Sequence, residues 1–136
     1  MLKKILSMAV LMAAVGQAAA QTPSPAGAMA YIISPADGAV VSSPLTVTFG
    51  LKGMGVAPAG TDRANTGHHH LLVDAKGLPA VGQPMGADVI HFGGGQTETS
   101  LELAPGKHTL QLIMGDMGHV PHHPVVVSKV VTITVK

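Results

Sequence analysis

Short runs of alternating apolar and polar residues, separated by glycine and proline, constrain the fold of this chain most strongly. The clearest run is 45–51, where Leu45, Val47, Phe49 and Leu51 face one way and the residues between them face the other. The 17 glycines and 10 prolines suit tight turns and argue against long helices. The pattern therefore predicts an all-β domain.

About seven strands are expected in roughly a hundred residues, which is the size of an immunoglobulin-like antiparallel β-sandwich. The candidate strands are 31–34, 45–51, 68–74, 88–92, 97–103, 107–114 and 125–135. Aromatic residues make up only 2% of the chain, so aliphatic residues and methionine must fill the core. Periodicity alone does not separate such a sandwich from a small barrel.

The first twenty residues have the pattern of a secretory signal peptide rather than of a folded element. Lys3 and Lys4 precede an apolar run over 5–15, and Ala18–Ala20 supplies the small residues of a cleavage site. The run is too short to span a bilayer, so no membrane span is expected after cleavage, although an uncleaved anchor is the alternative. We therefore expect a periplasmic protein with a signal peptide over 1–20, a flexible lead-in over 21–30 and a sandwich domain over 31–136.

The charge argues against nucleic-acid binding, and the lack of cysteine excludes disulfides and thiolate ligands. The net charge is +1, and the chain without its two N-terminal lysines is close to neutral, which argues against a nucleic-acid partner. The chain has no cysteine, so disulfides and thiolate metal sites are excluded. A bound metal would have to be held by histidine, carboxylate or methionine.

Eight histidines carry the chemical signal of the sequence. Loops after the second, fourth and sixth strands of an antiparallel sandwich lie at one end, and here they span 52–67, 93–96 and 115–124. Seven of the eight histidines lie in or beside these loops, whereas His108 begins a strand at the other end. Because neutral imidazole is the commonest metal ligand in proteins, this convergence predicts a metal site.

The direction of each side chain on the 68–74 strand ranks the candidate ligands. Leu71 and Val73 look like the core face, so His69 points inward, while His68 and His70 share the outer face with Cα atoms about 6.6 Å apart. The candidate ligands are His68, His69, His70, His91, His119 and His122, with Asp116, Met114, His123 and His108 as further candidates.

Copper is the metal that the sequence favours, with zinc a weaker candidate. Imidazole-rich sites suit Cu(II), Zn and Ni, and a thioether adds a preference for Cu(I). The methionines that could supply a thioether are Met54, Met85, Met114 and Met117, although core filling is the simpler interpretation of Met114. A hydrogen-bonded histidine cluster without metal fits the same residues.

Four strings of residues, in this order, resemble a family of small exported proteobacterial domains of unknown function. The strings are Gly67-His68-His69-His70-Leu71-Leu72-Val73-Asp74, His91-Phe92-Gly93-Gly94-Gly95-Gln96-Thr97-Glu98, Leu103-Ala104-Pro105-Gly106-Lys107-His108-Thr109-Leu110-Gln111-Leu112, and Gly115-Asp116 with His119-Val120-Pro121-His122. The resemblance covers about residues 31–136 and implies an exported single-domain protein without an established activity. His123 and Met117 lie outside what the strings share.

Three classes of function follow from these observations. The favoured one is a periplasmic metal-binding protein that sequesters or delivers copper, with an envelope metalloprotein as a potential partner. The second is a metal-free structural or interaction module of the cell envelope. The third is a copper-dependent redox enzyme, which we consider less favoured because no Ser/His/Asp arrangement and no paired carboxylates stand out.

Overall fold

The computed structural model describes residues 20–136, so the signal peptide predicted over 1–20 lies outside the described residues, Ala20 excepted. Within this range the chain forms nine strands and no helix, which confirms the all-β prediction. The strands are β1 (Met29–Ser34), β2 (Val40–Val41), β3 (Leu45–Lys52), β4 (Gly55–Val56), β5 (Thr66–Val73), β6 (Ile90–His91), β7 (Glu98–Leu101), β8 (Gly106–Gly115) and β9 (Val131–Val135). None of the described residues belongs to a helix long and apolar enough to cross a membrane.

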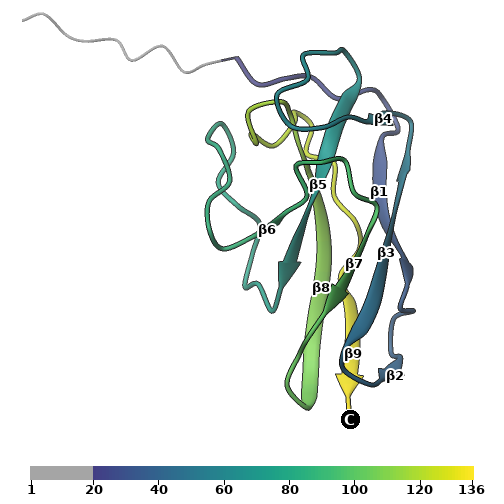
Figure 1. The fold of residues 1–136 in the computed structure, drawn as a ribbon. Coiled ribbons are helices and arrows are strands. Elements are labelled where there is room, and N and C mark those ends of the chain that lie inside the picture. Colours follow the sequence, from purple (N-terminus) through teal and green to yellow (C-terminus); the bar gives the residue numbers. More distant parts are fainter. Residues whose placement is uncertain (1–19) are drawn as a thin grey trace, which may run out of the picture.

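The strands form two sheets, as Figure 1 shows. One has three strands in the order β1-β3-β7, and the other has six in the order β2-β9-β8-β5-β4, with β6 also paired to β5. The long pairs are antiparallel, but β2 pairs with β9 and β4 with β5 in parallel. The six-stranded sheet is therefore mixed, whereas the three-stranded sheet is antiparallel. The prediction of an antiparallel sandwich was wrong at these two short strands, which pair with backbone groups that would otherwise lack a partner.

The main hydrophobic core contains residues from both sheets. On β3, Leu45, Val47 and Phe49 are buried, which confirms the alternation seen in the sequence. Phe49 packs on Phe92 with a ring-centroid distance of 4.8 Å. The other buried members are Ala30, Leu71, Leu101, Leu110, Leu112, Met114, Val126, Val131, Ile133 and Val135. The few aromatic residues thus add to a largely aliphatic core, as the composition predicts.

A second, smaller apolar cluster lies on the other face of the six-stranded sheet. Leu72 of β5 and Ile113 of β8 are buried there with Val89, and Met85, Val125 and Val127 pack against them. The covering residues come from the segments before β6 and after β8, and Figure 1 shows the β5–β6 segment beside β5, away from β1 and β3. The face of β5 predicted to be the outer one is therefore covered, and this covering positions the candidate site.

Three predicted strands are shorter than expected. The strand expected over 125–135 is reduced to β9 because the Ser128 hydroxyl accepts the Leu112 N–H, which interrupts the ladder at that point. The strands expected over 88–92 and 97–103 are reduced to β6 and β7. In the lead-in, the Ser24 N–H donates to the His123 carbonyl and the His123 N–H donates to the Thr22 carbonyl.

Candidate metal centre

Strand β5 supplies the two buried histidines of the candidate centre. His68 and His70 lie two residues apart, so both point to the same face, as the alternation predicts. Their exposed fractions are 0% and 1%, because the β5–β6 segment and the loop after β8 cover that face. The prediction that His68 and His70 lie on an outer face was therefore wrong, since the sequence of one strand does not show what packs over that face.

Two further imidazoles come from β6 and from the loop after β8. His91 of β6 is the antiparallel partner of His70, and it is exposed. His119 is half-buried and has a positive φ of 66°. The loop that carries His119 is folded around Asp116, whose Oδ1 accepts the N–H groups of Gly118 and Val120. Asp116 thus shapes the loop instead of joining the imidazoles.

The four imidazoles of His68, His70, His91 and His119 converge on one small volume. Each offers a ring nitrogen, and these four atoms all lie within 4.8 Å of one another. His68 Nε2 lies 3.0 Å from His119 Nδ1 and 3.1 Å from His91 Nε2. The rings of His91 and His119 meet edge-to-face at a centroid distance of 4.3 Å. We call these four residues the four-histidine centre.

Hydrogen bonds between the imidazoles do not satisfy all the ring nitrogens of the four-histidine centre. A neutral imidazole has one N–H and one acceptor nitrogen. His68 Nε2 faces two other ring nitrogens, while its buried Nδ1 has no hydrogen-bond partner among the described residues. Both ring nitrogens of His70 are likewise buried and without a partner there. Since buried polar groups are nearly always satisfied, this gathering of lone pairs needs another explanation.

The environment keeps the two buried imidazoles neutral. Burial, reinforced by the neighbouring His119 and His91, lowers the pKa of His68 from 6.5 to about 4. Burial and the neighbouring His68, His91 and His119 lower the pKa of His70 from 6.5 to about 3. The pKa of His91 is also lowered, by burial and by His119. Neutral imidazoles carry the free lone pair that a metal requires.

The spacing of the donors suits a metal of the first transition series. Bonds of about 2.0–2.1 Å to imidazole nitrogen place ligand atoms about 3.3 Å apart in a tetrahedral site and about 2.9 Å apart for neighbours in a square-planar one. The observed 3.0 and 3.1 Å separations fall between these values. The donor set is entirely imidazole, which suits copper, zinc and nickel better than the hard cations calcium and magnesium.

Two glycines lie so close to imidazoles of the centre that a Cβ at either position would collide with a ring. A Cβ on Gly115, which faces His68 across the ladder, would come within 2.6 Å of His70 Cε1. A Cβ on Gly93 would collide with the ring of His91. The Gly115 contact could not be read from the sequence, because it depends on which strands lie side by side, whereas Gly93 is only two residues from His91 in the chain. Gly115 in particular is a residue of the site that sequence reasoning missed.

Of the other four main candidate ligands, two lie in the centre and two do not. His91 and His119 are in the centre, whereas His69 points into the core, as predicted, against Phe49 at a ring distance of 5.2 Å. Its Nε2 lies 3.5 Å from the Gly50 carbonyl oxygen, so the structure does not bring it to the centre.

His122 and two of the further candidates do not belong to the four-histidine centre. His122 is buried, and its Nε2 lies 3.1 Å from the Thr66 carbonyl oxygen. Met114 is buried in the main core, which supports the core-filling interpretation. His123 is exposed and is held through its backbone by the lead-in.

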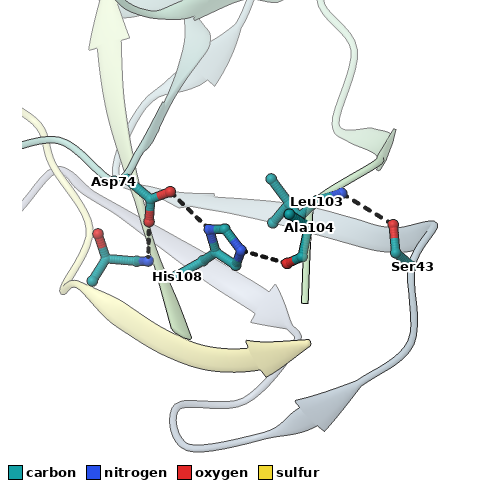
Figure 2. A network of polar contacts seen from close by, with 6 residues as sticks. Ser43, Asp74, Leu103, Ala104 and His108 are labelled. Atoms are coloured by element: carbon teal, nitrogen blue, oxygen red, sulfur yellow. Dashed lines mark hydrogen bonds and ion pairs between the residues drawn. The ribbon is translucent and has the colours of Figure 1, made fainter. Parts of the chain in front are cut away.

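His108 lies at the other end of β8, as predicted, and has its own partners (Figure 2). Its Nδ1 lies 2.7 Å from Asp74 Oδ2 and its Nε2 lies 2.7 Å from the Ala104 carbonyl oxygen. Asp74 Oδ1 also accepts the Thr109 N–H. Because both of its ring nitrogens face oxygen acceptors, His108 holds a turn together and is not a ligand of the centre.

Comparison with known proteins places the chain in a family without assigning it an activity. Residues 47–136 match a family described as "Domain of unknown function (DUF4399)". No curated protein and no solved structure matches the chain. The expected resemblance to a domain family of unknown function is thereby confirmed, while the exported and proteobacterial character of its members stays a prediction.

Proposed function

We propose that this chain, which belongs to the DUF4399 family, is a periplasmic protein that sequesters or delivers copper at its four-histidine centre. The observation that carries this proposal is the convergence of four ring nitrogens within 4.8 Å, two of them on buried imidazoles. A metal ion would accept all four lone pairs at once, which protons shared between neutral imidazoles do not. Loading such a site would also satisfy nitrogens that folding has removed from water.

The imidazole donor set and the order of affinities of divalent metals for nitrogen ligands both favour copper over zinc. Nitrogen sites bind Cu(II) more tightly than the neighbouring divalent metals of the series. The centre contains no carboxylate, because Asp116 accepts hydrogen bonds from its own loop and from the Thr22 hydroxyl. An all-imidazole site of this kind therefore supports copper as the cargo.

Storage or transfer fits the centre better than catalysis. Four protein ligands fill the coordination of a tetrahedral ion, whereas catalytic metal sites keep a position open for water or substrate. Exposure rises across the centre, from buried His68 and His70 through half-buried His119 to exposed His91. An ion could enter or leave on the His91 side, where an envelope metalloprotein could exchange it.

A metal-free structural role is the second candidate. The two short nitrogen–nitrogen separations, at 3.0 and 3.1 Å, also fit hydrogen bonds between imidazoles. Such bonds would tie β5 to β6 and to the loop after β8. They would leave His70 without any partner among the described residues, which is why we favour the metal.

The location and the finer fold class are also proposals. The lysine-led apolar run over 5–15 supports export to the periplasm with cleavage after Ala20. An immunoglobulin-like topology is supported by the sheet orders β1-β3-β7 and β9-β8-β5, which parallel the division of strands in constant-type immunoglobulin domains.

A metal titration tests the proposed function. Purified metal-free protein is titrated with Cu(II), Cu(I) and Zn(II), and the metal content is measured after dialysis. We expect one tightly held equivalent of copper that is lost in the His68→Ala/His70→Ala variant and kept in the matched control His123→Ala. Weak binding of several equivalents, unchanged in the double variant, would remove the metal-binding proposal and leave the structural role.

A further inference from the structure

Met85 lies in the β5–β6 segment, where its backbone is tied to the four-histidine centre. Its N–H donates to the carbonyl oxygen of His119 at 2.9 Å, so the residue that carries one imidazole also holds Met85 in place. The Met85 side chain packs against the small apolar cluster around Leu72 and Ile113. Met85 is therefore part of the cover over the buried histidines of β5.

The end of the Met85 side chain and the His70 imidazole approach the same point. A Cβ built on Gly115 would lie 2.9 Å from Met85 Cε and 2.6 Å from His70 Cε1, with His70 Nδ1 at 3.2 Å. Gly115 leaves this space free, and the thioether end and the imidazole share it. The methyl end of the thioether and the one histidine of the centre whose two ring nitrogens both lack a partner among the described residues thus border the same space.

The other three candidate methionines are placed differently. Met114 is buried in the main core, and Met54 packs against that core. Met117 is 49% exposed. Of these four, Met85 is the one whose side-chain end lies at the space beside Gly115 that His70 also borders.

We propose that Met85 determines the metal specificity of the centre by placing a soft thioether sulfur beside the four imidazoles, so that Cu(I) is held in preference to Zn(II). This inference rests on the proposed metal-binding function. Thioether sulfur is a soft ligand that favours Cu(I), so it would take the position of one imidazole around Cu(I), whereas zinc would keep the imidazoles alone. The unbranched side chain has three rotatable bonds, which lets the sulfur turn toward an ion without moving the backbone.

The test compares Met85→Leu with Met117→Leu in the purified protein. A Met-to-Leu change nearly conserves volume and costs less than about 1.5 kcal/mol in a packed site, so both variants should fold, which thermal unfolding checks. Cu(I) and Zn(II) affinities are measured by competition with chelators of known affinity. We expect Met85→Leu to lower the Cu(I) affinity at least about tenfold while the Zn(II) affinity stays within about threefold. Met117→Leu should change neither.

A spectroscopic readout separates ligation from packing. X-ray absorption of the Cu(I)-loaded protein should show a sulfur neighbour that is absent in Met85→Leu and present in Met117→Leu. Equal Cu(I) affinities for wild type and Met85→Leu, or a copper environment of nitrogen only, would overturn the specificity role. That result leaves the four-histidine centre intact, whereas failure of the wild-type protein to bind Cu(I), Cu(II) or Zn(II) would overturn the proposed function itself.

Discussion

Histidines at the two ends of strand β8, His108 on β8 itself and His68 and His70 on its neighbour β5, have opposite electrostatic surroundings. At one end, both ring nitrogens of His108 lie 2.7 Å from oxygen acceptors, on Asp74 and on Ala104 (Figure 2). At the other end, His68 faces only nitrogens of other imidazoles, and His70 has no partner among the described residues. Both ring nitrogens of the histidine at one end thus face an oxygen acceptor, whereas ring nitrogens of the histidines at the other end keep unpaired lone pairs.

The pKa values of these histidines are shifted in opposite directions at the two ends. Hydrogen bonds to Asp74 and to the Ala104 carbonyl raise the pKa of His108. Burial lowers the pKa of His68 and of His70, to about 4 and about 3. Acceptors stabilise the imidazolium at one end, and desolvation with imidazole neighbours excludes it at the other. The comparison shows that the surroundings of each histidine, rather than its residue type, separate a structural histidine from a candidate metal ligand.

The largest expected effect is on metal binding. Replacing both buried ligands in His68→Ala/His70→Ala should lower copper affinity at least about a hundredfold, because two of the four donors are lost. Isothermal titration or chelator competition measures this. The same assay on His108→Ala should give wild-type affinity. Equal losses in the two variants would mean that the two ends do not differ as described.

The second-largest effect is expected on the stability of the metal-free protein, which the His70→Leu variant should raise. His70→Leu removes two buried nitrogens that have no partner and keeps an apolar side chain in their place. We expect the free energy of unfolding of the metal-free protein to rise by about 1–3 kcal/mol, as measured by urea denaturation. Copper should stabilise wild type but not this variant. A loss of stability in metal-free His70→Leu would show that the nitrogens are satisfied in solution.

The pH dependence of stability should differ in sign between the two ends. Because the folded pKa of His68 and of His70 lies below the unfolded value of 6.5, the unfolded chain takes up protons first. The metal-free protein should therefore lose stability as the pH falls from 6.5 toward 4. The advantage of His70→Leu over wild type, followed in urea at each pH, should grow over the same interval. A constant difference would contradict the lowered pKa of His70.

The smallest effect is expected at the His108 end. The folded pKa of His108 is raised above 6.5, so its contribution is fully present below pH 6.5 and is lost as the pH rises through the folded pKa. His108→Ala should therefore lower the melting temperature more at pH 6 than at pH 9, while copper affinity stays within about twofold. Asp74→Asn provides the partner control. Equal destabilisation at both pH values would mean that the contact does not depend on the imidazolium.

Much of the site was predictable because strand geometry is local. Alternation along 66–73 separates His69, which faces the core, from His68 and His70, which share the other face. The up-and-down course of the strands also places the β5, β6 and post-β8 histidines at one end and His108 at the other. These inferences need only the side-chain period of two and the order of the strands.

The sequence by itself determined an all-β chain, the faces of β5 and the end at which most histidines gather, because backbone period and strand order are properties of local pattern. The tertiary structure decided which imidazoles meet, that His122 stays apart, and that His68 and His70 are buried beneath the β5–β6 segment. It also decided that Gly115 lies beside both His70 and Met85. These facts depend on contacts between segments far apart in the chain, whose packing no single stretch of residues encodes.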